Sequence, residues 1–383
     1  MEKVKFGIIG IGNMGSAHVV NINNLKNCEL TAVCDIDPEA FNRIDEGIRS
    51  RLQLFTDPEK FLKEAEIDAV MISVPHYSHP DLAILAMRQG KHVIVEKPIA
   101  VHKAEAERMI AEAKKYPELK KSAMFNQRTI PAHKKIKQMI DSGELGKIMR
   151  VNWIITDWFR SQCYYDSGDW RASWRGEGGG VLLNQCPHQL DLMQWFFGMP
   201  CKVRATAKFG KYHDIEVEDD VTAYLEFANG MTGVFVTTTG DAPGTNRLEI
   251  SGTKGKLVCE HDTITFDKLG ADEREWCKTC PEGFKKPDCE VVEVETDGRN
   301  AQHPEVLNKF AAHILRGEPL VADGREGING LMISNAMHLS SWLDHEVTLP
   351  IDEKKFYELL MERCKHSRHK EESGKTFATE GSY

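Results

Sequence analysis

Short runs of consecutive apolar residues, separated by stretches with helical periodicity, organise the first third of the chain. The apolar runs are Val4–Ile9, Leu30–Cys34, Ala69–Val74, Val93–Val95 and Ser122–Phe125. The helical stretches between them include Ser16–Lys26, Pro80–Gln89 and Ala104–Lys115. Strands that are apolar on both faces and alternate with helices predict a parallel sheet that is covered on both sides.

The second half of the chain has strand patterns that follow one another without helices between them. We expect these strands at Val151–Thr156, Val203–Phe209, Val221–Phe227, Thr232–Thr239, Leu248–Ser251 and Lys256–Glu260. Asn229-Gly230 stands between two of them and is a strong signal for a tight hairpin. Helical patterns return at Pro304–Arg316 and Gly327–Leu343. This half therefore predicts an α+β domain with a large open, mostly antiparallel sheet.

Composition narrows the class of protein. The chain has 383 residues with 58 Asp and Glu against 49 Lys and Arg, a formal net charge of −9. An acidic balance without a basic stripe argues against nucleic acid as the partner. No run of 18 apolar residues exists, so we expect no membrane span. Ten cysteines scattered over a long chain favour reduced thiols and a cytoplasmic protein.

Three of these cysteines, Cys277, Cys280 and Cys289, lie close together in a stretch rich in Gly, Pro and Lys. A zinc site there requires a fourth ligand. We therefore interpret the three as free thiols, with a disulfide or a metal as the alternative.

A glycine-rich turn follows the first apolar run. Gly10, Gly12 and Gly15 form the pattern G-x-G-x-x-G, which opens a helical stretch, and Asp35 ends the next strand twenty residues beyond Gly15. In this context the pattern indicates a dinucleotide site in a Rossmann fold. The glycines permit the tight turn, the approach of a pyrophosphate and close helix packing, and the helix N-terminus offers free N–H groups. We include Asn13 and Met14 of the turn among the cofactor-binding residues.

Asp35 is expected to accept hydrogen bonds from the adenosine ribose, and its charge would repel a 2′-phosphate. The sequence therefore predicts NAD rather than NADP. Asp37 precedes Pro38, and we interpret it as a helix cap rather than a cofactor contact.

Two further turns follow expected strands. One contains Ser73, Val74 and His79, and the other contains Glu96-Lys97-Pro98. In open α/β sheets, ligands lie beyond the carboxyl ends of the strands, so both turns are expected to face the cofactor. An ion pair between Glu96 and Lys97 is the alternative interpretation of the second turn.

Taken with a later stretch, Gly178-Gly179-Gly180 to Asp191, these motifs resemble the glucose–fructose oxidoreductase/inositol dehydrogenase family (Gfo/Idh/MocA). The resemblance covers the chain from Val4 to about Leu349. It implies an α/β fold with a Rossmann doubly wound parallel sheet over 1–126. A substrate-binding and oligomerisation α+β domain over 127–350 and a C-terminal helix with a polar tail over 351–383 follow. It also implies homodimers, homotetramers or higher homo-oligomers.

The resemblance assigns roles to individual residues. Lys97 matches the lysine that polarises the reacting hydroxyl, and His188 matches the histidine that is commonly the acid/base. Asn184 stands where inositol dehydrogenase-like members have Asp; since an amide cannot take a proton, it can only orient substrate or His188. Asp191 or Asp157 is then a candidate for the missing charge.

The same resemblance extends to the cofactor side of the pocket. Trp174-Arg175 resembles the family's Trp-Arg element near the nicotinamide. Asn126-Gln127-Arg128 resembles its turn after the fifth strand, with Asn126 and Arg128 expected at the cofactor. Structural ion pairs are the alternative for both arginines.

Aromatic residues gather before the glycine-rich stretch, with four of the seven Trp between positions 153 and 174. They suit the C–H face of a sugar ring, although core packing explains such clusters equally well. We name Trp158, Tyr165, Asp157, Asn184 and Gln185 as substrate-binding candidates. These groups are neutral or acidic and suit an uncharged polyol.

The leading hypothesis is an NAD-dependent oxidoreductase that transfers hydride between the nicotinamide and a ring secondary hydroxyl, or ketone, of a sugar, glycoside or cyclitol. One alternative is an enzyme with tightly bound NAD that is used transiently, as in a glycosidase or a sugar–sugar oxidoreductase. Another is a non-catalytic NAD-binding regulator, which would need neither Lys97 nor His188.

Overall fold

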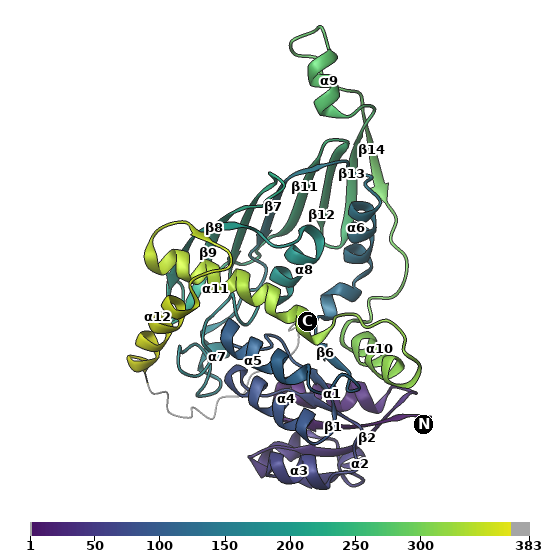
Figure 1. The fold of residues 1–383 in the computed structure, drawn as a ribbon, viewed down its shortest axis with the longest axis vertical. Coiled ribbons are helices and arrows are strands. Elements are labelled where there is room, and N and C mark those ends of the chain that lie inside the picture. Colours follow the sequence, from purple (N-terminus) through teal and green to yellow (C-terminus); the bar gives the residue numbers. More distant parts are fainter. Residues whose placement is uncertain (1, 369–383) are drawn as a thin grey trace.

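The first of two sheets is built from the N-terminal part of the chain, in a computed structural model that describes residues 2–368 (Figure 1). Its six strands are β1 (Val4–Ile9), β2 (Cys28–Cys34), β3 (Gln53–Phe55), β4 (Ala69–Ile72), β5 (His92–Val95) and β6 (Lys121–Ala123). They are all parallel and lie in the order β3-β2-β1-β4-β5-β6. The order reverses between β1 and β4, which is the switch point of a Rossmann fold. The predicted parallel sheet is confirmed.

Helices cover both faces of this sheet, as the all-apolar strands require. They are α1 (Asn13–Asn23), α2 (Glu46–Arg49), α3 (Pro58–Glu64), α4 (His79–Arg88) and α5 (Lys103–Ala113). Side chains fix where they begin: Asp57 accepts hydrogen bonds from the N–H groups of Glu59 and Lys60 at the start of α3. Asp37 caps the short 3₁₀ helix η1 (Pro38–Arg43) in the same way, as predicted.

The second sheet has nine strands in the order β14-β13-β12-β11-β7-β10-β9-β8-β15. The strands are β7 (Ile148–Ile155), β8 (Lys202–Phe209), β9 (Glu218–Glu226), β10 (Thr232–Thr238), β11 (Asn246–Gly252), β12 (Gly255–Glu260), β13 (Thr263–Leu269), β14 (Cys289–Val294) and β15 (Val347–Thr348). Only β7 and β10 pair in parallel, and the hairpin between β9 and β10 turns at the predicted Asn229-Gly230. The predicted open, mostly antiparallel sheet is confirmed, although β13, β14 and β15 were not expected.

The helices of the second half take different places around this sheet. They are α6 (Pro131–Asp141), α7 (Gln162–Asp166), α8 (Pro187–Phe197), α9 (Glu273–Thr279), α10 (Gln302–Arg316), α11 (Gly327–Leu343) and α12 (Glu353–Lys365). Helices α8 and α11 lie between the two sheets, and α9 projects from the far tip of the molecule (Figure 1). Within residues 2–368, no helix combines the length and apolar composition that crossing a bilayer requires.

Helix α10 returns to the first sheet although it comes late in the chain. Val306, Leu307 and Phe310 are buried in the same cluster as β1, and the rings of Phe310 and Phe6 lie 6.2 Å apart. The predicted middle domain of 127–350 thus contains a helix that packs on the Rossmann core. The boundaries at 126 and 350 stay predictions, and most of the expected polar tail lies outside the described residues.

Candidate active site

The glycine-rich turn leaves a cradle at the start of α1. Gly10 has φ +90°, and a Cβ there would lie 2.2 Å from the carbonyl oxygen of Ser73. A Cβ on Gly15 would lie 1.8 Å from the carbonyl oxygen of Gly10, whereas one on Gly12 would have no atom within 4 Å. Gly10 and Gly15 are therefore needed for close packing, whereas Gly12 faces open space beside the helix N-terminus. This arrangement fits a pyrophosphate.

The carboxylate of Asp35 is held beside this cradle. Its Oδ2 accepts a hydrogen bond from the main-chain N–H of Ile11 at 2.6 Å, and its Oδ1 accepts one from the N–H of Asp37 at 3.0 Å. Because each carboxylate oxygen has two lone pairs, both oxygens can still accept ribose hydroxyls.

Glu96 follows β5 and is buried against His18. It is 5% exposed, and its Oε1 lies 2.7 Å from Nε2 of His18 on α1. Burial opposes its ionisation, but the hydrogen bond and charge of His18 outweigh burial and lower the pKa of Glu96 to about 2. Its Oε2 accepts the main-chain N–H of Lys97 at 3.1 Å, so the pair fixes the backbone that carries Lys97.

Lys97 joins the two halves of the chain. Its Nζ donates a hydrogen bond to the main-chain oxygen of Asn184 at 2.7 Å. Burial lowers the pKa of the Lys97 ammonium, and although Glu96 opposes this shift, the charges of Arg160 and Arg171 add to it. A positive charge at the carboxyl end of β5 thus lies directly beside the second glycine-rich turn.

That turn is held by Glu218, which lies in β9 and is fully buried. Its Oε1 accepts hydrogen bonds from the main-chain N–H groups of Gly180 at 2.8 Å and Leu182 at 3.0 Å. A Cβ on Gly180 would lie 2.0 Å from the Glu218 carbonyl oxygen. The turn leads into α8, which begins at Pro187, so this proline starts the helix rather than bending it.

His188 lies in the first turn of α8 and is 7% exposed. Its Nδ1 is buried and has no hydrogen-bond partner within residues 2–368. Burial lowers the pKa of His188 well below its ordinary value, and the charges of Lys97 and His303 act in the same direction. The imidazole is therefore neutral at pH 7 and is able to accept a proton.

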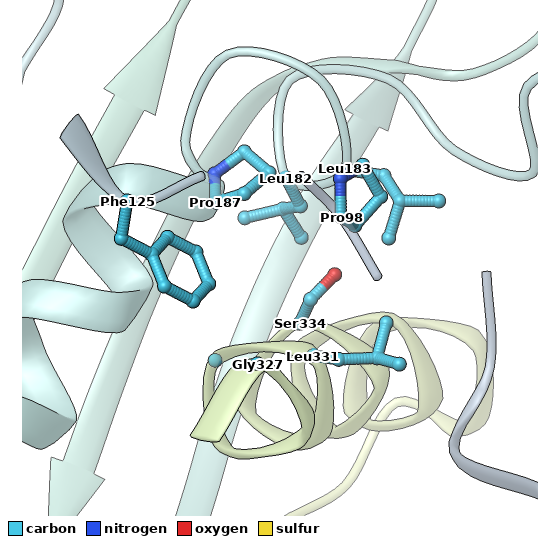
Figure 2. A pocket seen from close by; sticks show the side chains of 9 residues that line it. Pro98, Phe125, Leu182, Leu183, Pro187, Gly327, Leu331 and Ser334 are labelled. Atoms are coloured by element: carbon cyan, nitrogen blue, oxygen red, sulfur yellow. The ribbon is translucent and has the colours of Figure 1, made fainter. Parts of the chain in front are cut away.

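Helix α11 packs against the segments that carry Lys97 and His188. Figure 2 shows Pro98 of the first turn and Leu182, Leu183 and Pro187 of the second facing Leu331 and Ser334 of this helix. The space between them is about 10 Å³, scarcely enough for one water molecule. Lys97 and His188 are thus held by packed apolar side chains.

Sequence comparisons assign this architecture. A family profile described as an oxidoreductase family with an NAD-binding Rossmann fold matches residues 4–120, and one described as the GFO/IDH/MocA C-terminal domain matches residues 133–258. The chain belongs to the Gfo/Idh/MocA family. The family assignment made from the motifs is confirmed, and NAD is the cofactor that the glycine cradle serves.

The similar proteins are oxidoreductases of low sequence identity. Myo-inositol 2-dehydrogenase of Thermotoga maritima is 23% identical over 347 residues, which span 87% of this chain and 95% of the relative. Levoglucosan dehydrogenase of Pseudarthrobacter phenanthrenivorans is 26% identical, over 72% of this chain and 79% of its own. The WlbA dehydrogenase of Chromobacterium violaceum, solved with NADH and UDP-GlcNAcA, has a TM-score of 0.76 and 26% identity, covering 92% of this chain and 97% of its own.

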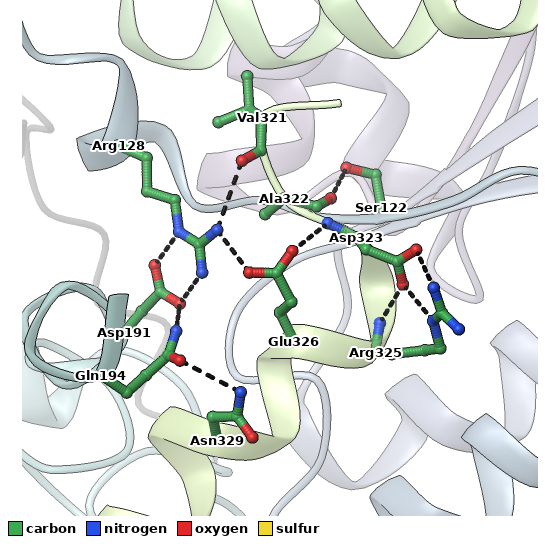
Figure 3. Close-up of polar contacts among 10 residues, drawn as sticks. All are labelled: Ser122, Arg128, Asp191, Gln194, Val321, Ala322, Asp323, Arg325, Glu326 and Asn329. Atoms are coloured by element: carbon green, nitrogen blue, oxygen red, sulfur yellow. Dashed lines mark hydrogen bonds and ion pairs between the residues drawn. The ribbon is translucent and has the colours of Figure 1, made fainter. Parts of the chain in front are cut away.

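Arg128 lies in a buried network of ion pairs in this Gfo/Idh/MocA protein. It is 3% exposed and binds both carboxylate oxygens of Asp191, at 2.6 and 2.7 Å, and Glu326 at 2.7 Å (Figure 3). The alternative of a structural ion pair holds instead. Since Asp191 is committed to Arg128, it does not replace the missing carboxylate, and the expectation that it might is wrong. Asp157 is partly exposed, and the partial burial of its carboxyl raises its pKa. No hydrogen bond joins it to His188 in residues 2–368.

The carboxylate nearest Asn184 is Glu177, which sequence reasoning missed. It is 2% exposed, and its Oε1 accepts a hydrogen bond from Nδ2 of Asn184. The signal in the sequence was its position directly before the glycine-rich stretch, seven residues from Asn184. Burial raises the pKa of Glu177, although Arg171 and the bond from Asn184 oppose the shift.

Two Trp-Arg pairs precede the second glycine-rich turn, Trp170-Arg171 and Trp174-Arg175. Trp174 is 5% exposed and packs against Trp342 at 5.6 Å, and Arg175 is exposed. Arg171 lies 4.5 Å from the ring centres of both Trp170 and Tyr164, and it contributes to the lowered pKa of Lys97. The cofactor role of Trp174 and Arg175 stays a prediction, and Arg171 is a further basic residue whose charge acts on Lys97.

Of the two adjacent tyrosines, Tyr164 and not the predicted Tyr165 lies among the polar side chains of the site. Tyr165 is 2% exposed, and its hydroxyl lies 2.7 Å from Oγ1 of Thr239, so it belongs to the core. The hydroxyl of Tyr164 instead accepts hydrogen bonds from Gln185 at 3.1 Å and Arg171 at 2.7 Å. Gln185 Oε1 and Trp158 Nε1 are buried with no partner in residues 2–368. We keep Gln185 and Trp158 as substrate-binding candidates.

The remaining cofactor candidates divide between the site and its support. Ser73 and Val74 touch the Gly10 turn, and Asn13 and Met14 begin α1. Asn126 donates to Gln302 at 2.7 Å, and its Oδ1 is buried with no partner in the described chain. His79 is fully buried with its ring nitrogens 2.7 and 2.8 Å from the carbonyl oxygens of Pro98 and Val74, so it ties two turns together.

The three clustered cysteines lie far from this site. Cys277 is on α9, Cys280 follows it and Cys289 begins β14, and each is a free thiol. Within residues 2–368, no group of three His, Cys, Asp or Glu side chains is arranged to hold a metal ion.

Proposed function

We propose that this protein is an NAD-dependent dehydrogenase that oxidises a ring secondary hydroxyl of a sugar, glycoside or cyclitol, or reduces the corresponding ketone. The observation that carries the proposal is the meeting of Lys97 and His188 at the carboxyl end of β5. The Lys97 Nζ bond to the main-chain oxygen of Asn184 joins the turn after β5 to the segment that leads into His188. A regulator that only binds NAD would need neither side chain.

The chemistry divides between the cofactor and the protein. Bound NAD supplies a hydride acceptor at its nicotinamide ring. His188, neutral at pH 7, takes the hydroxyl proton as the general base. Lys97 places its ammonium beside the oxygen that becomes negative during the reaction, and a charge in a partly dry site stabilises an alkoxide strongly.

Polar groups around these two residues suit a polyhydroxylated ring. The unpartnered Oε1 of Gln185 is a hydrogen-bond acceptor and the Nε1 of Trp158 is a donor, while the flat faces of Trp158 and Tyr164 suit ring C–H groups. Relatives named as inositol and levoglucosan dehydrogenases support this substrate class.

The test is NADH absorbance with the purified protein across a panel of inositols, free sugars and aryl glucosides. We expect NADH to form with at least one ring polyol and to vanish in His188→Ala, with NAD binding retained. Product formed without net NADH would favour transient use of bound NAD. NAD binding without turnover of any panel member, in either direction, would refute the proposal.

We also propose a homo-oligomer. Ile154 and Tyr224 are 39% and 42% exposed on the outer face of the second sheet, and Val234 and Val236 lie in register with them. Apolar sheet surface rarely stays open to water. Light scattering at micromolar concentration should give a multiple of the 43.3 kDa chain mass, and a monomer mass would contradict the proposal.

A further inference from the structure

Glu177 makes two contacts that together hold the turn before the active site. Its Oε2 accepts the main-chain N–H of Ala172 at 2.6 Å, and its Oε1 accepts the side-chain amide of Asn184. Ala172 is fully buried at φ +58°, a left-handed conformation that costs a residue with a Cβ about 1 kcal/mol. A buried carboxylate thus stabilises this turn and at the same time contacts Asn184, a candidate substrate-binding residue.

The contact with Asn184 fixes which way its amide points. An ionised carboxylate only accepts hydrogen bonds, and the amide has a donor end and an acceptor end. Nδ2 must therefore face Glu177, and Oδ1 must face away from it. Oδ1 has no hydrogen-bond partner within residues 2–368, while the main-chain oxygen of the same residue binds Nζ of Lys97. An uncharged acceptor is therefore available next to the lysine.

We propose that Glu177 is a positioning residue that turns Asn184 so that Oδ1 accepts a hydrogen bond from a hydroxyl of the substrate ring. The inference rests on the proposed function and adds a requirement to it: the ring carries a hydroxyl donor at this position. An acidic side chain at 184 would accept the same bond without help. With an amide at 184, the carboxylate that sets the orientation comes from the preceding turn.

A merely structural role for Glu177 is separable from this one. In Glu177→Gln the new side chain can keep an oxygen toward the N–H of Ala172. Its amide nitrogen then faces Asn184 and, being a donor, forces Asn184 to turn Oδ1 inward and present Nδ2 to the substrate. The turn keeps its hydrogen bond while the substrate meets a donor instead of an acceptor.

The experiment exchanges the carboxylate and the amide between positions 177 and 184. Activity is measured as NADH formation with the best polyol of the panel. Glu177→Gln should lower kcat/KM by about 10- to 100-fold, because one oriented hydrogen bond is lost and a donor opposes the hydroxyl. Asn184→Asp should also lower it, since two carboxylates then face each other. The double variant Glu177→Gln/Asn184→Asp should return to within about threefold of the wild type, because the glutamine donates to the new carboxylate.

Controls separate the site from the fold. Glu105→Gln alters a surface carboxylate that binds Arg108 on α5 and does not contact Asn184, so it should leave kcat/KM unchanged. The Kd for NAD should be the same in all variants. A ring analogue with fluorine in place of the recognised hydroxyl accepts but cannot donate, so the wild type should lose about as much kcat/KM on it as Glu177→Gln loses on the parent polyol.

The outcomes distinguish the two claims. A wild type that turns over no polyol refutes the proposed function, and this inference falls with it. An active wild type whose double variant is no better than Asn184→Asp refutes the positioning role alone. If Glu177→Gln does not fold, the double variant still decides, because the exchanged pair must restore both folding and activity.

Discussion

Replacing Gly12 by Ala should separate cofactor binding from folding. Gly12 has φ −73° and ψ −162°, an extended conformation that alanine adopts, and the added Cβ would meet no atom within 4 Å. Restricting the unfolded chain stabilises the fold by about 0.4–1 kcal/mol. Alanine is the poorer residue at this helix N-cap, which costs about 0.5–1 kcal/mol. The free energy of unfolding without NAD should therefore change by less than about 1 kcal/mol.

The affinity for NAD should fall sharply in the same variant. The new methyl group occupies the open space through which the pyrophosphate approaches the N–H groups at the start of α1. A hydrogen bond to a charged group contributes about 1.5–3 kcal/mol. Losing one such bond raises the Kd for NAD by about 10- to 100-fold.

Two other glycines provide matched controls for calorimetric NAD titration and urea unfolding. A Cβ on Gly283 also meets no atom within 4 Å, and Gly283 lies away from the cradle, so Gly283→Ala should change neither quantity. Gly15→Ala should destabilise the fold itself, because its Cβ would lie 1.8 Å from the oxygen of Gly10. A wild-type Kd for NAD in Gly12→Ala would refute the assignment of the cradle.

Four further predictions follow from the site. Asp35→Ser should narrow the preference for NAD over NADP in calorimetric titration by removing a charge that repels the 2′-phosphate; equal affinities in the wild type would contradict this. His188→Ala should lower kcat by about 10²–10⁴-fold and abolish the acidic limb of the pH profile of kcat/KM. That limb lies below pH 6.5 because the pKa of His188 is lowered. Lys97→Met should lower kcat equally severely but keep the acidic limb. Asp191→Asn should reduce the free energy of unfolding in urea by about 1.5–3 kcal/mol, because Arg128 loses one charged partner but keeps Glu326, and it should not move the limb. Burial lowers the pKa of His303 to about 4, so between pH 6.5 and 4 the unfolded chain binds a proton that the folded chain does not. As the pH falls from 6.5 to 4, the free energy of unfolding should therefore decrease by up to about 3 kcal/mol. The decrease should be smaller in His303→Gln.

Local features of the fold were predictable because neighbouring residues determine them. Val4–Ile9 forms β1 with the predicted bounds, since an apolar run that ends at a glycine turn has few alternatives. Gly327–Leu343 likewise forms α11 with the predicted bounds. Helix α1 begins at Asn13 rather than Ser16, because Gly12 already serves as its N-cap. Sequence motifs predict that a helix is present more accurately than they predict the residue at which it begins.

The arrangement of side chains around the pocket was not predictable. Tyr164 and Tyr165 are adjacent on a helix of five residues, too short for periodicity to show which one faces the core. Trp170 and Trp174 lie in a turn without regular phase. His18 and Glu218 are hidden in sequence because their partners are distant: Glu96 is 78 residues from His18, and the N–H groups that Glu218 binds are 36 and 38 residues away.

Three contacts explain why the two halves of the chain form one site. Turns after β4 and β5 carry His76, Tyr77 and Lys97, and each binds a main-chain oxygen of the segment 174–184. Nδ1 of His76 lies 3.1 Å from the oxygen of Glu177, the hydroxyl of Tyr77 donates to Trp174 at 2.9 Å, and Nζ of Lys97 donates to Asn184 at 2.7 Å. Burial lowers the pKa of His76, so its neutral ring donates through Nδ1.

Because all three acceptors are carbonyl oxygens, the contacts depend on the path of the backbone and not on the side chains of that segment. The glycines, Glu218 and Glu177 set this path, and Ala172 takes a left-handed conformation within it. The side chain of Asn184 is therefore not needed to join the domains, and it is left to face the substrate. A turn fixed in this way can exchange an acid for an amide at position 184 without losing the position of Lys97, provided that another carboxylate orients the amide.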